Sequence, residues 1–248
     1  MRSFFSNPAG ALPRVPAHAR NLQGRMAARR AHNAGLLRAG WSLLVSAALI
    51  GAAAPARADA YEDFNRAVAT DDARTLTRLL ERGMDPNTVN EKGEPALITA
   101  AREGSPPVVK ALIQARVRIN VKNEFGDTPI MIAALKGNLP MVRLLREAGA
   151  EINQPGWTPL LYAASNGNDA VVEYLLSSGA DLALAAPNGV TPVMLAVHAN
   201  KADTVKLLIS YGFDLTARND KGETALLWAK KREYKDIEQI LRRAGAKE

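Results

Sequence analysis

The stretch GWTPLLYAASNGNDAVVEYLLSSGAD, residues 156–181, contains two short markers that recur along the chain. The first marker is Gly-x-Thr-Pro-Leu or a close variant, and it begins at Gly93, Gly126, Gly156, Gly189 and Gly222. Successive glycines of this marker lie 33, 30, 33 and 33 residues apart. The second marker resembles Gly-Ala-Asp and recurs in phase with the first at Gly83, Gly149, Gly179 and Gly212. Two phased markers at one spacing indicate a protein built from internal repeats.

Each repeat contains the signals for two short helices. Thr-Pro is typical of a helix start, because Thr supplies a capping oxygen and Pro loses no hydrogen bond at the first helical position. The apolar pattern at 171–176 buries one face of a second helix, and the following Gly suits a left-handed helix end. Helices this short are unstable alone in water. The pattern therefore predicts an all-α array whose units stack on their neighbours.

The period and the Thr-Pro-Leu marker resemble those of the ankyrin-repeat family. The resemblance covers residues 61–248, and it implies an ankyrin-repeat solenoid of about six helix-turn-helix units joined by short β-finger turns. The expected units are 61–90, 91–123, 124–153, 154–186, 187–219 and 220–248, of which the first and last are caps. The order of features, a signal peptide followed by an aromatic-acidic start and the repeats, resembles that of bacterial exported ankyrin-repeat proteins.

Three departures from the family pattern have structural consequences. The family's His after Thr-Pro-Leu is replaced by an apolar residue in each unit, so packing has to compensate for the lost hydrogen bonds. In the second unit Arg116 stands where Gly is expected, which predicts either strain of about 1–2 kcal/mol or a changed turn. The 30-residue interval trims one finger to Gln154-Pro155, and Pro106-Pro107 is expected to open the second helix of its unit.

Residues 1–60 read as a leader. They contain eight Arg, no Lys and the single acid Asp59, followed by 24 basic and 24 acidic residues in 61–248. The apolar segment 41–54 follows basic residues and precedes Ala58-Asp59-Ala60, which predicts a signal peptide cleaved after Ala60 and export, most simply to a bacterial periplasm. An uncleaved membrane anchor is the alternative, although 14 residues is shorter than the ~20 that span a bilayer. Met26 is an alternative start that would give a leader of ordinary length.

The composition of 61–248 argues against several classes of function. Its basic and acidic residues balance, so no basic surface for nucleic acid is expected. The chain has no Cys, and His198 is the one His after residue 60, so neither a thiolate nor a histidine metal cluster is expected. No nucleotide-binding or metalloprotease motif occurs. We expect a non-enzymatic protein without cofactor or metal, and a hydrolase built on His198 is the remote alternative.

The resemblance implies that a partner protein is held by the finger tips and by the ends of the first helices on the concave face. The matching residues selected here are Phe125, Asp127, Lys136, Trp157, Asn166, Val190, His198 and Lys230. Phe125 and Trp157 are the aromatic candidates, since exposed aromatics often anchor interfaces. Trp157 has an alternative role, in which it covers the shortened finger by packing on Tyr162 or Phe125. Tyr162 and Trp228 align with a buried helix position and are expected in the core.

The sequence thus predicts a periplasmic protein-binding module, centred on the third to fifth units and monomeric. A secreted effector that acts on another cell is the alternative within the same fold. The pattern leaves open whether His198 is an ordinary surface residue or a pH-sensitive contact. It does not identify the partner.

Overall fold

The computed structural model describes residues 53–247, with side chains from Asp59 onward. Within that range the chain forms twelve α-helices and no β-strand. Their bounds are α1 Ala53–Ala69, α2 Ala73–Glu81, α3 Ala96–Glu103, α4 Pro106–Gln114, α5 Pro129–Leu135, α6 Leu139–Glu147, α7 Pro159–Asn166, α8 Asp169–Ser177, α9 Pro192–His198, α10 Ala202–Ser210, α11 Ala225–Lys231 and α12 Lys235–Arg243. The helices follow one another as six pairs, which confirms the predicted all-α repeat array.

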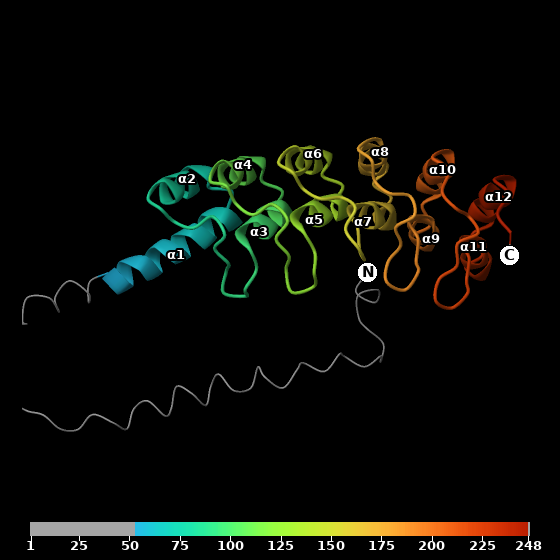
Figure 1. Ribbon diagram of the computed structural model, residues 1–248, viewed down its shortest axis with the longest axis horizontal. Helices are drawn as coiled ribbons and strands as arrows, with labels where there is room; N and C mark the ends of the chain where they lie inside the picture. The colour runs from blue at the N-terminus through green and yellow to red at the C-terminus, as the bar shows by residue number, and fades with distance from the viewer. Residues whose placement is uncertain (1–52, 248) are drawn as a thin grey trace, which may run out of the picture. The chain divides into compact units, whose positions relative to one another are not determined.

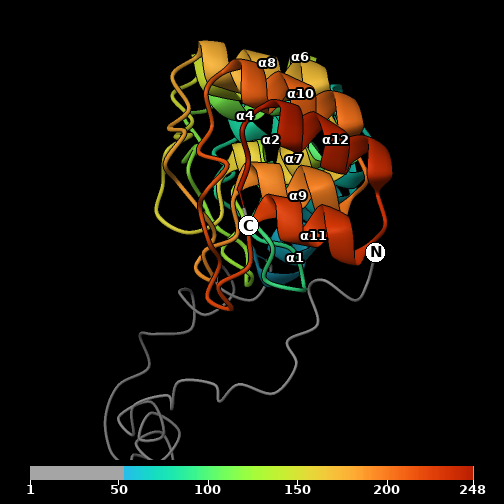
Figure 2. The same ribbon diagram turned by 90° about the vertical axis from the view of Figure 1, so that its right-hand side faces the viewer.

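The helices are arranged in two rows. The first helices of the pairs (α1, α3, α5, α7, α9 and α11) contact one another in sequence, and the second helices form another row, drawn above the first in Figure 1. Five loops connect successive pairs; we call them fingers 1 to 5, and they span 82–95, 115–128, 148–158, 178–191 and 211–224. The fingers project to one side of the first-helix row (Figure 2). We call the surface made by the first helices and the fingers the finger face.

The core lies between the two rows and repeats with the units. The last residue of each first marker is almost completely buried, at Leu97, Ile130, Leu160, Val193 and Leu226. The residues that replace the family's His are buried as well at Met131, Leu161 and Met194. Burial of apolar area is the main favourable contribution to folding. The missing histidine hydrogen bonds are thus offset by apolar packing, as the sequence predicts.

Thr precedes four of the first helices, and in three of them its hydroxyl caps the helix as expected. The hydroxyls of Thr158, Thr191 and Thr224 accept hydrogen bonds from the backbone N–H three residues later, at 3.2–3.3 Å. Thr128 differs, because its buried hydroxyl makes no hydrogen bond to the described part of the chain. Its backbone N–H instead donates to the Met131 sulfur at 3.2 Å. Pro106 opens α4 behind the capping residue Ser105, as predicted.

The second marker ends each second helix in a left-handed turn. Arg116 adopts this conformation with a φ of 62°, at the position where the other fingers have Gly. Its N–H donates to the Ile113 carbonyl at 2.9 Å, the same bond that Gly149 makes to Arg146 at 3.0 Å. The turn is therefore kept, and the expected strain is present at Arg116 instead of a changed turn.

Finger 3 is shortened as predicted. It spans 148–158, whereas fingers 2 and 4 span 115–128 and 178–191. Gln154 belongs to this finger and is buried, and its side-chain amide donates a hydrogen bond to the Trp157 carbonyl at 3.4 Å. The row of finger tips is thus interrupted between fingers 2 and 4.

The predicted leader lies mostly outside the described residues. The apolar segment 41–54 contributes only Ala53 and Ala54 to the described part, and the predicted cut after Ala60 falls within α1. The buried residues of α1 among the described side chains are Phe64, Ala67 and Val68, all beyond that cut. Among residues 53–247, no helix combines the length and apolar character needed to cross a bilayer.

Candidate functional site

Three fingers are built on an asparagine that folds the loop onto itself. The side-chain oxygens of Asn90, Asn123 and Asn219 each accept hydrogen bonds from two backbone N–H groups, located two and four residues later, at 2.8–3.1 Å. Such bonds are the usual reason why Asn is favoured in turns. Sequence reasoning missed these residues, although Asn90 and Asn123 are one period apart and Asn219 stands in the same register.

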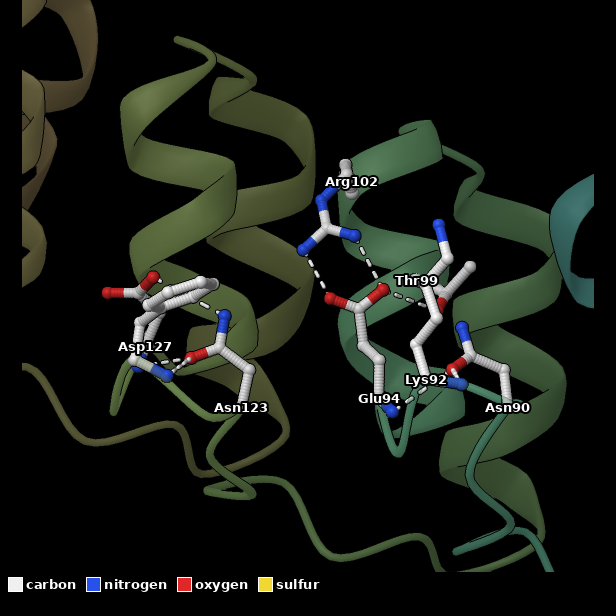
Figure 3. Close-up of polar contacts among 8 residues, drawn as sticks. Asn90, Lys92, Glu94, Thr99, Arg102, Asn123 and Asp127 are labelled. Carbon is white, nitrogen blue, oxygen red and sulfur yellow. Dashed lines mark hydrogen bonds and ion pairs between the residues drawn. The ribbon is translucent and has the colours of Figure 1, made fainter. Parts of the chain in front are cut away.

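The acid at the base of finger 1 is bound to its own unit. Glu94 receives two hydrogen bonds from the Arg102 guanidinium and one from the Thr99 hydroxyl at 3.1 Å (Figure 3). These bonds, and the further carboxylates of Glu103 and Asp127, raise the pKa of Arg102 above its ordinary value. The pair holds finger 1 against α3, and its two charges are already compensated.

Asp127 occupies the equivalent place in finger 2 and links it to the next unit. Its carboxylate accepts a hydrogen bond from the Tyr162 hydroxyl at 2.5 Å and lies beside the Asn123 amide. Tyr162 is 5% exposed, which confirms its prediction as a core residue. Burial, and secondarily the Asp127 carboxylate, raises the pKa of Tyr162. Asp127 therefore has a structural role, because its Oδ1 atom already accepts the hydrogen bond from Tyr162.

Glu223 repeats this arrangement in finger 5. It accepts hydrogen bonds from Trp228 Nε1 at 2.7 Å, from the Asn219 amide at 3.2 Å and from Lys231 Nζ at 2.5 Å. These bonds, the one from Lys231 contributing most, lower the pKa of Glu223 to about 2. Trp228 is 8% exposed, in agreement with its predicted core position.

The expectation that Val190 is exposed for a partner is wrong. Val190 is in register with Glu94, Asp127 and Glu223 but is only 4% exposed. Its carbonyl accepts a hydrogen bond from the Ala186 N–H at 2.9 Å, which closes the base of finger 4. This position faces the first helix instead of the solvent. The acids Glu94, Asp127 and Glu223 therefore form hydrogen bonds within the array, and Val190 is buried.

Trp157 packs against Tyr162. The two ring centroids are 5.4 Å apart and the ring planes are inclined by 40°. The Trp157 side chain is half-buried and contacts the core. This contact supports the packing alternative, in which Trp157 covers the shortened finger.

Asn166 and His198 end two first helices, and both contact a neighbouring unit. The Asn166 amide donates to the Leu135 carbonyl at 2.7 Å and so caps the preceding first helix. The His198 ring lies edge-on to Trp228, with centroids 5.9 Å apart. Burial, and to a lesser degree the charge of Arg232, lowers the pKa of His198, which favours the neutral ring at neutral pH. Lys136 is exposed after α5, and Lys230 is half-buried on α11.

Phe125 is the selected apolar residue that the structure leaves most open. It stands near the tip of finger 2, and 79% of its surface is exposed. Its backbone N–H is held by Asn123 at 3.0 Å, so the ring is presented by an ordered turn. A large apolar side chain exposed on a rigid loop favours contact with a partner.

A hollow of about 860 Å³ opens beside Phe125 on the finger face. We call it the N-terminal groove. It is lined by α1, finger 1, the end of α3 and the tip of finger 2, from Tyr61 to Phe125. The Tyr61 hydroxyl donates to the Val89 carbonyl and joins α1 to finger 1 at its edge. The hollow is lined by residues of the first two expected units and by Glu124 and Phe125 of the third, which is the first of the three units predicted to form the centre of binding.

The described residues offer no cluster of three or more His, Asp or Glu side chains arranged to hold a metal. Asp71-Asp72, a carboxylate pair in the sequence, is explained by local structure. Asp72 caps α2 by accepting from the Thr75 N–H at 3.0 Å, and Asp71 occupies a left-handed turn.

The repeats, their paired helices and their fingers define a repeat protein with one continuous face formed by helices and loops. The chain belongs to the ankyrin-repeat family, whose three-copy model matches residues 64–155, 100–186 and 160–247. Ankyrin repeats are typical protein–protein interaction modules.

The structure is similar to the crystal structure of an ankyrin repeat domain from Acinetobacter baumannii AYE. The TM-score is 0.67 and the sequence identity is 29%, over 74% of this chain and 98% of that domain. No curated protein matches the chain.

Proposed function

We propose that this protein is a non-enzymatic binding module that holds a partner protein on its finger face. The exposed ring of Phe125 is the observation that carries this proposal. Of the other selected residues, Asp127 and Asn166 are bonded within the array, Val190 is buried and Trp157 and His198 pack on aromatic rings. Lys136 and Lys230 are polar, so Phe125 is the one selected apolar residue that is exposed and not packed within the array.

The non-enzymatic part of the proposal rests on the environment of His198. A general base has to reach a substrate and to accept a proton near neutral pH. His198 is half-buried against Trp228, and its lowered pKa is governed by burial. It behaves as a packed residue at the contact between two units.

Site-specific photo-crosslinking tests the binding surface. A photoreactive amino acid replaces Phe125 in one variant and Tyr211 in a matched control. Tyr211 is also an exposed aromatic, but it caps α10 at the base of finger 5 and lies beside α6 and α8 of the second-helix row, away from the finger tips. We expect one dominant protein adduct from position 125 and none from position 211, identified by mass spectrometry in intact cells. Equal labelling from both positions, or none from 125 with the protein folded, argues against the finger face.

We further propose that the protein acts in the bacterial periplasm after cleavage of its leader. The cut predicted after Ala60 retains Phe64, Ala67 and Val68, the buried residues of α1. Cell fractionation and N-terminal sequencing test this part. We expect Tyr61 at the N-terminus of periplasmic protein, and release to the medium would favour the effector alternative instead.

A further inference from the structure

The N-terminal groove has a chemical character of its own. It contains five acidic and three basic side chains among its lining residues. Two of the basic residues are already paired, Arg66 with Asp63 and Arg102 with Glu94. Because these two cations are neutralised by their partners, they contribute little positive potential to the groove.

Four carboxylates remain to face an incoming ligand. They belong to Glu62 on α1, Glu91 on finger 1, Glu103 at the end of α3 and Glu124 on finger 2, and all four are exposed. No ion pair joins any of them to another described residue, and Lys92 is the one lining cation left without such a pair among residues 59–247. Acids from four elements therefore line the groove.

Glu103 occupies a position that does not serve its own helix. It is the last residue of α3, where the helix dipole disfavours a negative charge. A carboxylate there adds to the negative potential of the groove at a small cost to the helix. Its influence is visible in the raised pKa of Arg102, to which Glu103 contributes after Glu94.

Phe125 supplies an aromatic surface at the rim of the same groove. An arginine guanidinium can stack on an aromatic ring while it pairs with a carboxylate. Glu124 is the neighbour of Phe125 in the chain, so both contacts are offered side by side. The volume of about 860 Å³ accommodates several side chains of an extended segment.

We infer that the N-terminal groove binds an extended, arginine-rich peptide segment of the partner protein. This inference rests on the proposed binding function and specifies the site and the chemistry of what is bound. Charge complementarity orients the segment along the groove, and stacking on Phe125 fixes one arginine at the rim.

Fluorescence anisotropy with a defined probe tests the inference on the full chain. The probe is a short fluorescein-labelled peptide of alternating arginine and serine, compared with the matched peptide of glutamate and serine. We expect saturable binding of the arginine peptide only, weakened as salt rises because exposed charge pairs are screened. Equal binding of the two peptides overturns the inference, as does the absence of binding by the arginine peptide.

Paired charge variants locate the binding. Glu103→Gln with Glu124→Gln removes two groove charges, and Glu81→Gln with Glu147→Gln removes two exposed charges from the ends of α2 and α6. An exposed ion pair contributes a factor of about three, so the groove variant should bind about tenfold more weakly. The control variant should bind as the parent does. Equal weakening by both variants, or none by the groove variant, contradicts the assignment.

Stacking on Phe125 has its own test. Phe125→Leu keeps an apolar side chain but removes the aromatic face, and we expect severalfold weaker binding of the arginine peptide. If Phe125 crosslinks a partner whose affinity is insensitive to the groove charges, this inference fails and the proposed function stands. If nothing crosslinks at Phe125, the proposed function fails as well.

Discussion

At the scale of single residues, Arg116 is the clearest case of strain. It is held at a φ of 62° by the turn that ends α4, although a β-carbon disfavours this conformation. We predict that Arg116→Gly stabilises the fold by about 1 kcal/mol, because relief of strain exceeds the entropy gained by the unfolded chain. Urea unfolding followed by circular dichroism measures this difference.

The matched control for this change is Arg116→Ala, which removes the charged side chain but keeps the β-carbon. It should leave the free energy of unfolding nearly unchanged. Equal stabilisation by Ala and Gly would show that the side chain, and not the backbone, is unfavourable at this position.

Glu223 is expected to control the acid stability of finger 5. Its ordinary pKa of 4.5 falls to about 2 in the folded chain, so its contribution is complete above 4.5 and is lost as pH falls toward 2. Glu223→Gln should flatten the dependence of unfolding free energy on pH in this window. Glu223→Ala should cost about 1–3 kcal/mol, since the Trp228 N–H loses its acceptor. An unchanged pH profile in the Gln variant would contradict this assignment.

Residue-scale predictions from the sequence succeeded where the repeat pattern determines burial, as at Tyr162 and Trp228. They were wrong at Val190, because the position before the Thr of each first marker faces the adjacent first helix. The pattern places a residue along the finger, but it does not specify the direction of its side chain. That direction depends on hydrogen bonds within and between units.

At the scale of elements, a series of asparagines ties successive fingers together. The side-chain oxygens of Asn87, Asn120 and Asn153 accept hydrogen bonds from the backbone N–H groups of the next finger, at 2.9–3.0 Å. The three residues are 33 apart, so the sequence contained this signal in its period. The second marker is 30 residues further on at this point, from Gly149 to Gly179, so the next position of the series is Ala183. The side chain of Ala183 has no oxygen and cannot accept the bond.

We predict that Ala183→Asn extends this series to finger 5. An added hydrogen bond of this kind contributes about 1 kcal/mol. The matched control is Ala185→Asn, which places the same side chain in finger 4 but out of register. Thermal unfolding should show a higher Tm for Ala183→Asn only. Equal shifts of Tm in both variants would contradict the role of the asparagine series.

The elements themselves were predictable because the helix signals are local. Thr-Pro starts, glycine ends and the shortened finger 3 all follow from residues next to one another in the chain. The left-handed residues Asp71, Asn200 and Glu233 were not foreseen. They occur where paired helices meet. Asp and Asn adopt this conformation more readily than other residues with a β-carbon, whereas at Glu233 the packing of both helices imposes it on a residue that disfavours it.

At the scale of the molecule, the main helix contacts of each unit among residues 53–247 are with adjacent units, so stability should be a sum of local terms. Arg116 lies in the second unit, after α4, and Ala183 lies in the fourth unit, after α8. We predict that the effects of Arg116→Gly and Ala183→Asn add to within about 0.5 kcal/mol in the double variant. Urea unfolding of the parent, the two single variants and the double variant provides a double-mutant cycle. A coupling energy above about 0.5 kcal/mol would argue for a core shared beyond neighbouring units.

The position of the N-terminal groove is also a property of the whole molecule. The repeats identify which residues lie on fingers, but the hollow depends on how α1 stands against fingers 1 and 2. Residues from Tyr61 to Phe125 meet there, and this spacing is not a feature of any single repeat. Sequence reasoning selected Phe125 correctly as exposed, but the repeat spacing did not indicate a hollow between α1 and fingers 1 and 2.

The affinity of the crosslinked partner for Phe125→Ala tests the central claim most directly. Isothermal titration calorimetry of the parent, Phe125→Ala and the control Tyr211→Ala gives the three dissociation constants. An aromatic anchor contributes more than about 1–2 kcal/mol, so the Phe125 variant should bind at least about tenfold more weakly. The Tyr211 variant should bind as the parent does. Unchanged affinity in Phe125→Ala would contradict a partner site on the finger face.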